Sequence, residues 1–166
     1  MISKKIASVI TSVMVFCCIV GVSLTNVKAD DSAPKSVDGS YLTSADSSTG
    51  YTPKNNERGK HLMDGQCSIS KTGTKRIYAY GSTTANHTVD VIAVIVYVDK
   101  YNEKDGKWHQ IDAFSKKVEN DYYSAISKLI QVDRGYYYRV HASHIVCMAG
   151  SPDEETFSVT NGILVP

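Results

Sequence analysis

The feature that most constrains the fold is an unbroken apolar run, VIAVIVYV at Val91–Val98. These eight residues are too few to span a membrane, and the β-branched side chains that dominate them disfavour a helix. A run of this length and composition is typical of a central strand that is covered on both faces. The chain is therefore expected to build a sheet around this segment.

Short β-rich runs separated by turn residues surround this strand. The expected strands are Cys67–Ser70, Arg76–Ser82, Thr88–Tyr101, Trp108–Phe114, Ala125–Val132, Tyr136–Cys147, Thr156–Thr160 and Ile163–Val165. Asp105-Gly106 before Trp108 is a hairpin signal, and the polar stretch Ser115–Ser124 is expected to be a longer connection. The pattern predicts an all-β domain over residues 65–166, an antiparallel β-sandwich of the immunoglobulin or fibronectin III type with about seven strands. A small β-barrel is the alternative architecture.

The first residues have the pattern of a secretory signal peptide. Lys4 and Lys5 precede an apolar run at Ile6–Val22, and Val27 and Ala29 supply small residues before a cleavage site. We therefore expect residues 1–29 to be removed and the mature protein to be secreted, extracellular or associated with the cell surface. A membrane anchor is the rival interpretation of the apolar run, but serine and threonine dilute it and no basic cluster follows.

Residues 30–64 are rich in serine, threonine, aspartate, asparagine and glycine, without apolar periodicity. This composition predicts a flexible polar N-terminal arm. Removal of Lys4, Lys5 and Lys28 with the signal peptide would leave 15 of the 18 basic side chains against 17 acidic ones, a net charge of −2. A chain this close to neutral is not expected to bind nucleic acid, nor to insert stably in a membrane after cleavage.

Two cysteines, Cys67 and Cys147, remain after the predicted cleavage. Export favours their oxidation to a single disulfide, which would close a loop of about 80 residues and stabilise the fold by roughly 4 to 5 kcal/mol. Two unpaired thiols are the alternative.

The stretch RGYYYRVHASHIVC, Arg134–Cys147, divides into two faces because side chains alternate along a strand. Tyr136, Tyr138, Val140 and Ala142 form the expected core face. Tyr136 follows a turn glycine and is the candidate for a tyrosine corner, with a buried ring and a hydroxyl bonded to upstream backbone.

The opposite face of this strand is the candidate ligand surface. Tyr137, Arg139 and His141 could combine with Trp108 into an aromatic and polar platform for an extracellular protein or a glycan. The alternative is that these residues are cross-strand pairs that only stiffen the sheet.

Motifs for metal binding or catalysis are weak in this sequence. His141 and His144 are three residues apart, which on a strand places their rings on opposite faces. No nucleophile on a glycine-flanked turn and no metalloprotease motif is found. We therefore expect no cofactor, no metal and no enzymatic activity.

Two resemblances can be drawn. Tyr136-x-Tyr138-x-Val140-x-Ala142 resembles the sixth strand of fibronectin type III modules, although Gly135 stands directly before the tyrosine. The segments YGSTTA, TVDVIAVIVYV, RGYYYRVHA and TNGILV resemble a family of small secreted proteins from Gram-positive Firmicutes that is known only as a domain of unknown function. That resemblance implies export and a compact β domain, and it implies no reaction.

Together these patterns favour an extracellular or cell-surface binding module without catalysis. A small secreted antibacterial or toxin-like protein is the alternative, since its size and export would look the same.

Overall fold

The computed structural model describes residues 35–53 and 59–166, and the predicted signal peptide lies outside these residues. Over this part of the chain the protein consists of strands and no helix, which confirms the all-β prediction. The strands are β1 (Ser36–Val37), β2 (Ser40–Thr43), β3 (Ser47–Tyr51), β4 (Leu62–Lys71), β5 (Arg76–Asn102), β6 (Lys107–Gln131), β7 (Tyr136–Cys147), β8 (Glu154–Val159) and β9 (Gly162–Val165).

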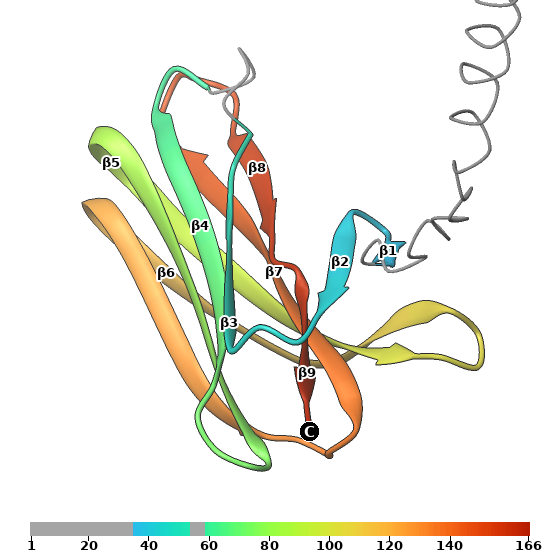
Figure 1. Cartoon of the computed structure of the whole chain (residues 1–166). Coiled ribbons are helices and arrows are strands. Elements are labelled where there is room, and N and C mark those ends of the chain that lie inside the picture. Colours follow the sequence, from blue (N-terminus) through green and yellow to red (C-terminus); the bar gives the residue numbers. More distant parts are fainter. Residues whose placement is uncertain (1–34, 54–58) are drawn as a thin grey trace, which may run out of the picture. The chain divides into compact units, whose positions relative to one another are not determined.

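The apolar run lies within β5, a strand of 27 residues that forms a long antiparallel hairpin with β6. The ladder between them is interrupted from Thr84 to Val89, where the two-stranded ribbon bends back on itself (Figure 1). Before the bend β5 pairs with β4, and after the bend it pairs with β7. One strand therefore takes part in two layers of the fold.

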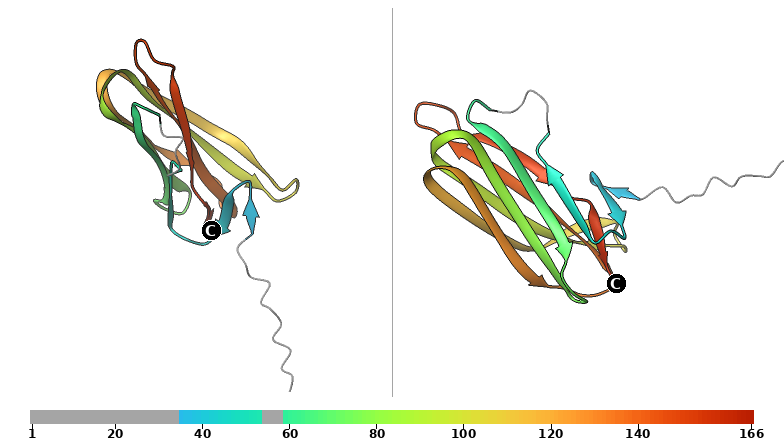
Figure 2. Two further views of the ribbon diagram at one scale, coloured as in Figure 1. Left: turned by 90° about the horizontal axis from the view of Figure 1, so that it is seen from above. Right: turned by 60° about the vertical axis from the view of Figure 1, so that its left-hand side comes forward.

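The bend places these layers face to face (Figure 2). The front layer contains β3, β4, the first half of β5 and the second half of β6, and the back layer contains the remaining halves with β7, β8 and β9. A side chain at Gly81 of the front layer would come within 2.6 Å of Val96 and 3.0 Å of Val94 of the back layer. The fully buried side chains of Ile69 and Ile77 belong to the same core.

The strand connectivity differs from the predicted immunoglobulin or fibronectin sandwich. All strands belong to one sheet that curls through the bends in β5 and β6, and β2 adds to β9 in the parallel direction. The sheet is a mixed half-barrel, so the barrel alternative describes it in part. Residues 115–124 were expected to be a connection, but they lie inside β6. Their polar composition was misleading, because β6 pairs only with β5 and a strand at the edge of a sheet can carry many polar side chains.

Much of the segment predicted to be a flexible arm forms strands of the sheet. Residues 36–51 form β1, β2 and β3, and β4 already begins at Leu62. Asp38 and Gly39 connect β1 to β2 with φ angles of 49° and 75°, the positive values of a two-residue type I′ hairpin. The Asp38-Gly39 pair is the sequence signal that could have predicted this hairpin.

The predicted disulfide between Cys67 and Cys147 is not found, and both thiols are free. The Cys67 thiol donates a hydrogen bond of 3.5 Å to the carbonyl oxygen of Val140. Cys147 lies seven residues beyond Val140 on β7, a distance of roughly 23 Å along an extended strand. A disulfide requires Cα atoms within about 7 Å, so this fold holds the two cysteines too far apart to pair within one chain.

Candidate functional site

Arg139, one of the predicted ligand-binding residues, is buried rather than exposed. Its Nε donates to Asp99 Oδ2 at 2.9 Å and its Nη2 to Asp38 Oδ2 at 2.9 Å. Its Nη1 donates to the backbone oxygen of Asp38 at 2.9 Å and to Ser40 Oγ at 3.1 Å. Arg139 on β7 thus holds the β1–β2 hairpin against the back layer.

Trp108 and His141 gather around the same guanidinium group. The Trp108 ring centroid lies 4.6 Å from the Arg139 guanidinium carbon, and its Nε1 donates to the Val37 carbonyl at 3.0 Å. His141 Nε2 lies 3.4 Å from Asp99 Oδ2, and its ring stacks on Tyr97 at 4.7 Å. We call Arg139, Asp99, Trp108 and His141, with Asp38 and Ser40 of the hairpin, the Arg139 cluster.

The charged side chains of Arg139 and Asp99 are buried in the Arg139 cluster. Burial alone would raise the pKa of Asp99, but hydrogen bonds from His141 and Arg139 outweigh this effect and keep its pKa below the usual value. Three of the four predicted residues therefore meet in space, but the chain's own hairpin covers Arg139. Tyr137 is half-buried and lies opposite Leu164 of β9, so it does not complete an open platform.

The tyrosine corner is formed by Tyr138 and not by Tyr136. The Tyr138 side chain is 1% exposed, and its hydroxyl donates to the Asp133 carbonyl at 3.0 Å and accepts from the Asp133 amide at 3.1 Å. Tyr136 is 42% exposed, with Lys100 Nζ 3.5 Å from its ring centroid. Parity identified the correct face, but Tyr136 lies beyond the end of the core.

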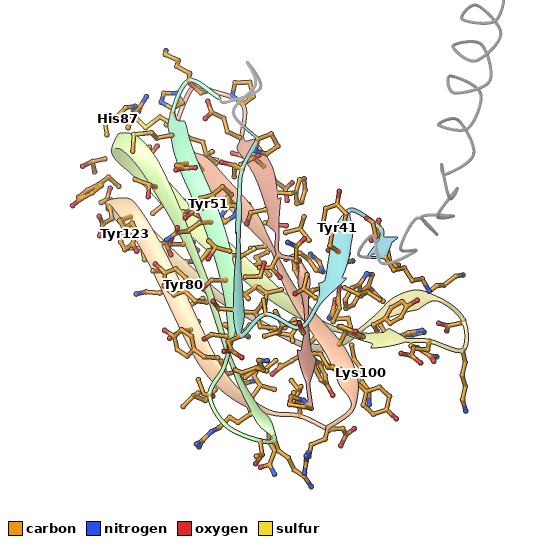
Figure 3. All side chains as sticks on the ribbon, in the orientation of Figure 1. Tyr41, Tyr51, Tyr80, His87, Lys100 and Tyr123 are labelled. Atoms are coloured by element: carbon orange, nitrogen blue, oxygen red, sulfur yellow. The ribbon has the colours of Figure 1, made fainter. Side chains whose placement is uncertain are left out.

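A different aromatic surface lies on the outer face of the front layer, across β3, β4, β5 and β6. It combines tyrosines with small hydroxyl and amide side chains, and Tyr51, Tyr80 and Tyr123 are labelled there in Figure 3. We call it the tyrosine face, and it consists of Tyr51, Asp64, Gln66, Ser68, Tyr78, Tyr80, Ser82, Thr84, Tyr123, Ala125 and Ser127.

Two tyrosines of this face lie along the strands. Tyr80 is paired with Ser127, and Tyr123 is four residues away on β6, roughly 13 Å along the strand. Their hydroxyl oxygens are nevertheless 2.8 Å apart. The two rings must therefore extend toward each other over the row between them, which holds the small residues Ser82 and Ala125.

The electrostatics of the tyrosine face are those of a polar, nearly uncharged surface. Burial would raise the pKa of Tyr80, but hydrogen bonds with Ser82, Tyr123 and Gln66 lower it. The carboxylate of Asp64 accepts a hydrogen bond of 2.9 Å from the Thr52 hydroxyl. A hollow of about 170 Å³ beside Tyr123 is lined by Asp64, Gly65, Gln66, Ser82 and Thr84.

Tyr51 lies at the β3 edge of the tyrosine face, across the sheet from Tyr123 on β6. It lies on β3 opposite Gln66, which pairs with Ser82 on β5, and it is 61% exposed. From β3 to β5 or β6 the separation is roughly 10 to 14 Å at the usual strand spacing. The face therefore carries exposed tyrosines on β3 and β6, with amide and hydroxyl groups of β4 and β5 between them. Sequence reasoning missed it, because Tyr51 lies in the segment interpreted as an arm and Tyr80 and Tyr123 are distant in sequence.

Two further places bring polar side chains together at the surface. A groove of about 480 Å³ beside the β5–β6 turn is lined by Lys100, His109, Ile111 and Tyr136 among others. At the opposite end, His61 Nδ1 lies 2.9 Å from His87 Nε2. In the described ranges no group of three or more histidine, cysteine, aspartate or glutamate side chains is placed to hold a metal ion.

Comparison with known proteins gives a family but no activity. Residues 27–162 match the model of a family described as a family of unknown function (DUF6147). No curated protein matches the chain. Among the residues described here, no helix has the length and hydrophobicity needed to cross a membrane. The expectation of a family without assigned function is confirmed, whereas the origin in Gram-positive bacteria stays a prediction and the likeness to fibronectin modules gains no support.

Proposed function

This chain belongs to that family of unknown function. From its own geometry we propose that it is a secreted binding module without catalytic activity. Its proposed ligand is an uncharged polysaccharide that binds to the tyrosine face. The predicted signal peptide at residues 1–29 supports the secreted part of this proposal. The tyrosine face supports the binding part.

The observation that carries the proposal is the composition and shape of the tyrosine face. Tyrosine offers a rigid apolar ring at low entropic cost and keeps a hydroxyl for hydrogen bonding, while serine and amide side chains adapt to a polar ligand. A sugar unit has the matching surfaces, since its C–H groups can pack on a ring and its hydroxyls can bond to Gln66 and Ser82. The spacing between Tyr51 and Tyr123 leaves room for more than one such unit.

The depth of the surface favours a polymer over a small molecule. A hollow of about 170 Å³ is smaller than the roughly 300 to 1,000 Å³ of pockets that enclose drug-sized ligands. An open surface contacts a ligand from one side and leaves it in water, which favours binding over chemistry that needs water excluded. An extended chain laid across several tyrosines can gain affinity from repeated weak contacts.

The charge of the surface favours a neutral ligand. Among the residues that define the face, Asp64 is the one charged side chain, and the nearest cation on the same side of β5 is Arg76, at its end two residues before Tyr78. A phosphate-rich polymer would need cations that this surface does not offer.

The test is depletion of the purified protein from solution by insoluble polysaccharides, namely cellulose, chitin and purified bacterial cell wall. We expect at least one of them to remove the protein, and the double variant Tyr51→Ala/Tyr123→Ala to bind about tenfold more weakly. Tyr136→Ala is the matched control, because Tyr136 and Tyr123 are both 42% exposed and lie on different surfaces.

Retention by none of the three polysaccharides, or equal loss in the Tyr136→Ala control, would contradict the proposal. Growth inhibition of bacteria by the wild-type protein and equally by the double variant would favour the antibacterial alternative. Export is tested separately by the mass of the protein in culture medium, which should correspond to a chain that begins at Asp30.

A further inference from the structure

The outer face of the back layer carries apolar side chains among serine, histidine and charged ones, and this surface is unrelated to the tyrosine face. The core side of β5 is fully buried at Ile92, Val94, Val96 and Val98. The other side of the same run is half-buried. The β1–β2 hairpin covers the adjoining row of Asp99 and Arg139, and the proposed surface is the part of the face beyond it. A run that is apolar on both sides is typical of a strand with both faces covered, so this face lacks the cover that its composition predicts.

Paired residues on β6, β5, β7 and β8 form transverse rows across this face. One row consists of Lys117, Ala93, Ile145 and Glu155 in that order. It has a cation at the β6 end, an anion at the β8 end, and one small and one large apolar side chain between them.

The next row along the strands consists of Ser115, Ile95, Ser143 and Phe157. Here small and large side chains alternate across the four strands. Phe157 at the β8 end is 59% exposed, which is unusual for an aromatic ring without a polar group.

The third row consists of Ala113, Tyr97, His141 and Val159. Val159 at the β8 end is 41% exposed, and the Tyr97 and His141 rings stack on each other. In all three rows the β8 end carries the larger side chain or the anion, and the β6 end carries the smaller side chain or the cation.

We propose that this face binds a second copy of the same chain. A twofold axis parallel to the strands, between β5 and β7, places β8 of one copy over β6 of the other at the same row. Glu155 then meets the second copy's Lys117, which also pairs with Glu119 of its own chain at 2.8 Å, and Phe157 meets Ser115. Between them Ile145 lies over Ala93, so charges of opposite sign and side chains of complementary size face each other.

The size of the face sets the expected strength. Four strands by three to four rows cover roughly 450 Å² per copy at standard strand spacings, or about 900 Å² over both copies, which is below the roughly 1,200 to 2,000 Å² of standard interfaces and typical of weak, transient association. A dissociation constant in the micromolar range is expected. The tyrosine face belongs to the other layer, so both copies would keep it exposed on opposite sides of the dimer.

The first test is sedimentation of the protein over a concentration range from about 1 μM to 1 mM, the span in which a micromolar dimer dissociates. We expect a monomer–dimer equilibrium in the wild type and at least a tenfold weaker association in Phe157→Glu, which places a charge in the interface. A monomer over the whole range, or an unchanged equilibrium in Phe157→Glu, would overturn the proposal.

The second test uses the row with charged ends. Lys117→Glu and Glu155→Lys should each dissociate more readily alone, because each places like charges opposite each other in the dimer. Mixing the two variants should restore association, since both charged contacts of the mixed dimer again join one acidic and one basic side chain.

Lys104→Glu, on the exposed turn between β5 and β6, is the control and should associate like the wild type. Circular dichroism checks that each variant is folded. Failure of the mixture to associate better than either variant alone would overturn the proposed geometry, because a dimer through another surface has no reason to respond to this exchange.

Discussion

The Arg139 cluster and the tyrosine face contain similar residue types, but the first is covered by the chain itself and the second is exposed. Both combine aromatic rings with polar side chains on the outer side of the curled sheet. At the Arg139 cluster the β1–β2 hairpin covers the ring of Trp108 and the guanidinium of Arg139, which is 6% exposed. On the tyrosine face Tyr51 and Tyr123 are 61% and 42% exposed.

This contrast shows that residue type does not identify a ligand surface until the cover is known. An arginine between two aspartates on a sheet can attract either a partner or another part of its own chain. Here the hairpin supplies Asp38 and Ser40, so the site is satisfied internally. Uncharged tyrosine and serine side chains need no charged partner from the protein, because water can satisfy their hydrogen bonds.

Breaking the Arg139 cluster should have the greatest effect. Arg139→Met would leave Asp99 buried without its cation, and removing one partner of a buried ion pair costs about 3 to 5 kcal/mol. Urea unfolding should show this loss, together with faster hydrogen exchange of the β2 amides. Tyr123→Ala on the open surface is the comparison and should change stability by less than about 1 kcal/mol. Equal losses in both variants would erase the distinction between the two regions.

The next effect concerns His144, a buried polar group of a kind that the tyrosine face does not contain. Burial lowers the pKa of His144 to about 4 from its ordinary 6.5. Below pH 6.5 the unfolded chain takes up a proton that the folded protein excludes, so stability is lost as the pH falls toward 4. From pH 7 to pH 5 the loss is roughly 2 kcal/mol from this group alone.

Urea titrations at a series of pH values measure this loss. His144→Gln should flatten the slope, because it removes the titrating ring while keeping groups that can bond to Thr83 and Ser158. An unchanged slope in the variant would mean that other groups dominate the acid response.

A smaller effect separates two tyrosines on one strand. Tyr138→Phe removes two hydrogen bonds to Asp133, at roughly 0.5 to 1.5 kcal/mol each, and leaves the backbone amide of Asp133 without its partner. Tyr136→Phe should be neutral within about 0.5 kcal/mol, because Tyr136 is exposed. The reverse ranking in thermal or urea unfolding would contradict the assignment of Tyr138 as the corner.

Reductant should have the least effect of all. Cys147 lies roughly 23 Å along β7 from Val140, which the Cys67 thiol contacts. Adding a reducing agent should therefore leave the unfolding transition and the intact mass unchanged. Burial raises the pKa of the Cys67 thiol to about 11, so this thiol should react with alkylating agents only after unfolding. A mass increase of two hydrogen atoms on reduction would require a different arrangement of β4 and β7.

The sequence was sufficient for the strands whose patterns are local. The run Val91–Val98 is a central strand between β6 and β7, and Tyr138, Val140 and Ala142 are buried as their parity predicts. The bend at Thr84–Val89 looks in sequence like a gap between two strands, because a polar Asn86-His87-Thr88 gives the same local pattern in either case.

The cover over each face could not be predicted from these patterns. Asp38 reaches Arg139 across 101 positions of the chain, and no local spacing encodes such a contact. The same holds for the tyrosine face, where Tyr80 and Tyr123 meet across 43 positions. Parity assigns a side chain to a face, but only the tertiary structure shows what lies on that face.

NMR mapping of ligand contacts tests most directly whether the tyrosine face is the binding surface. Amide and aromatic shifts of the labelled protein would be followed during titration with soluble chitohexaose and cellohexaose. We expect at least one of them to shift the resonances of Tyr51, Tyr80 and Tyr123 and to leave those of Trp108 and Arg139 unchanged. Shifts centred on Trp108 and Arg139, or no shift with either oligosaccharide, would contradict this assignment.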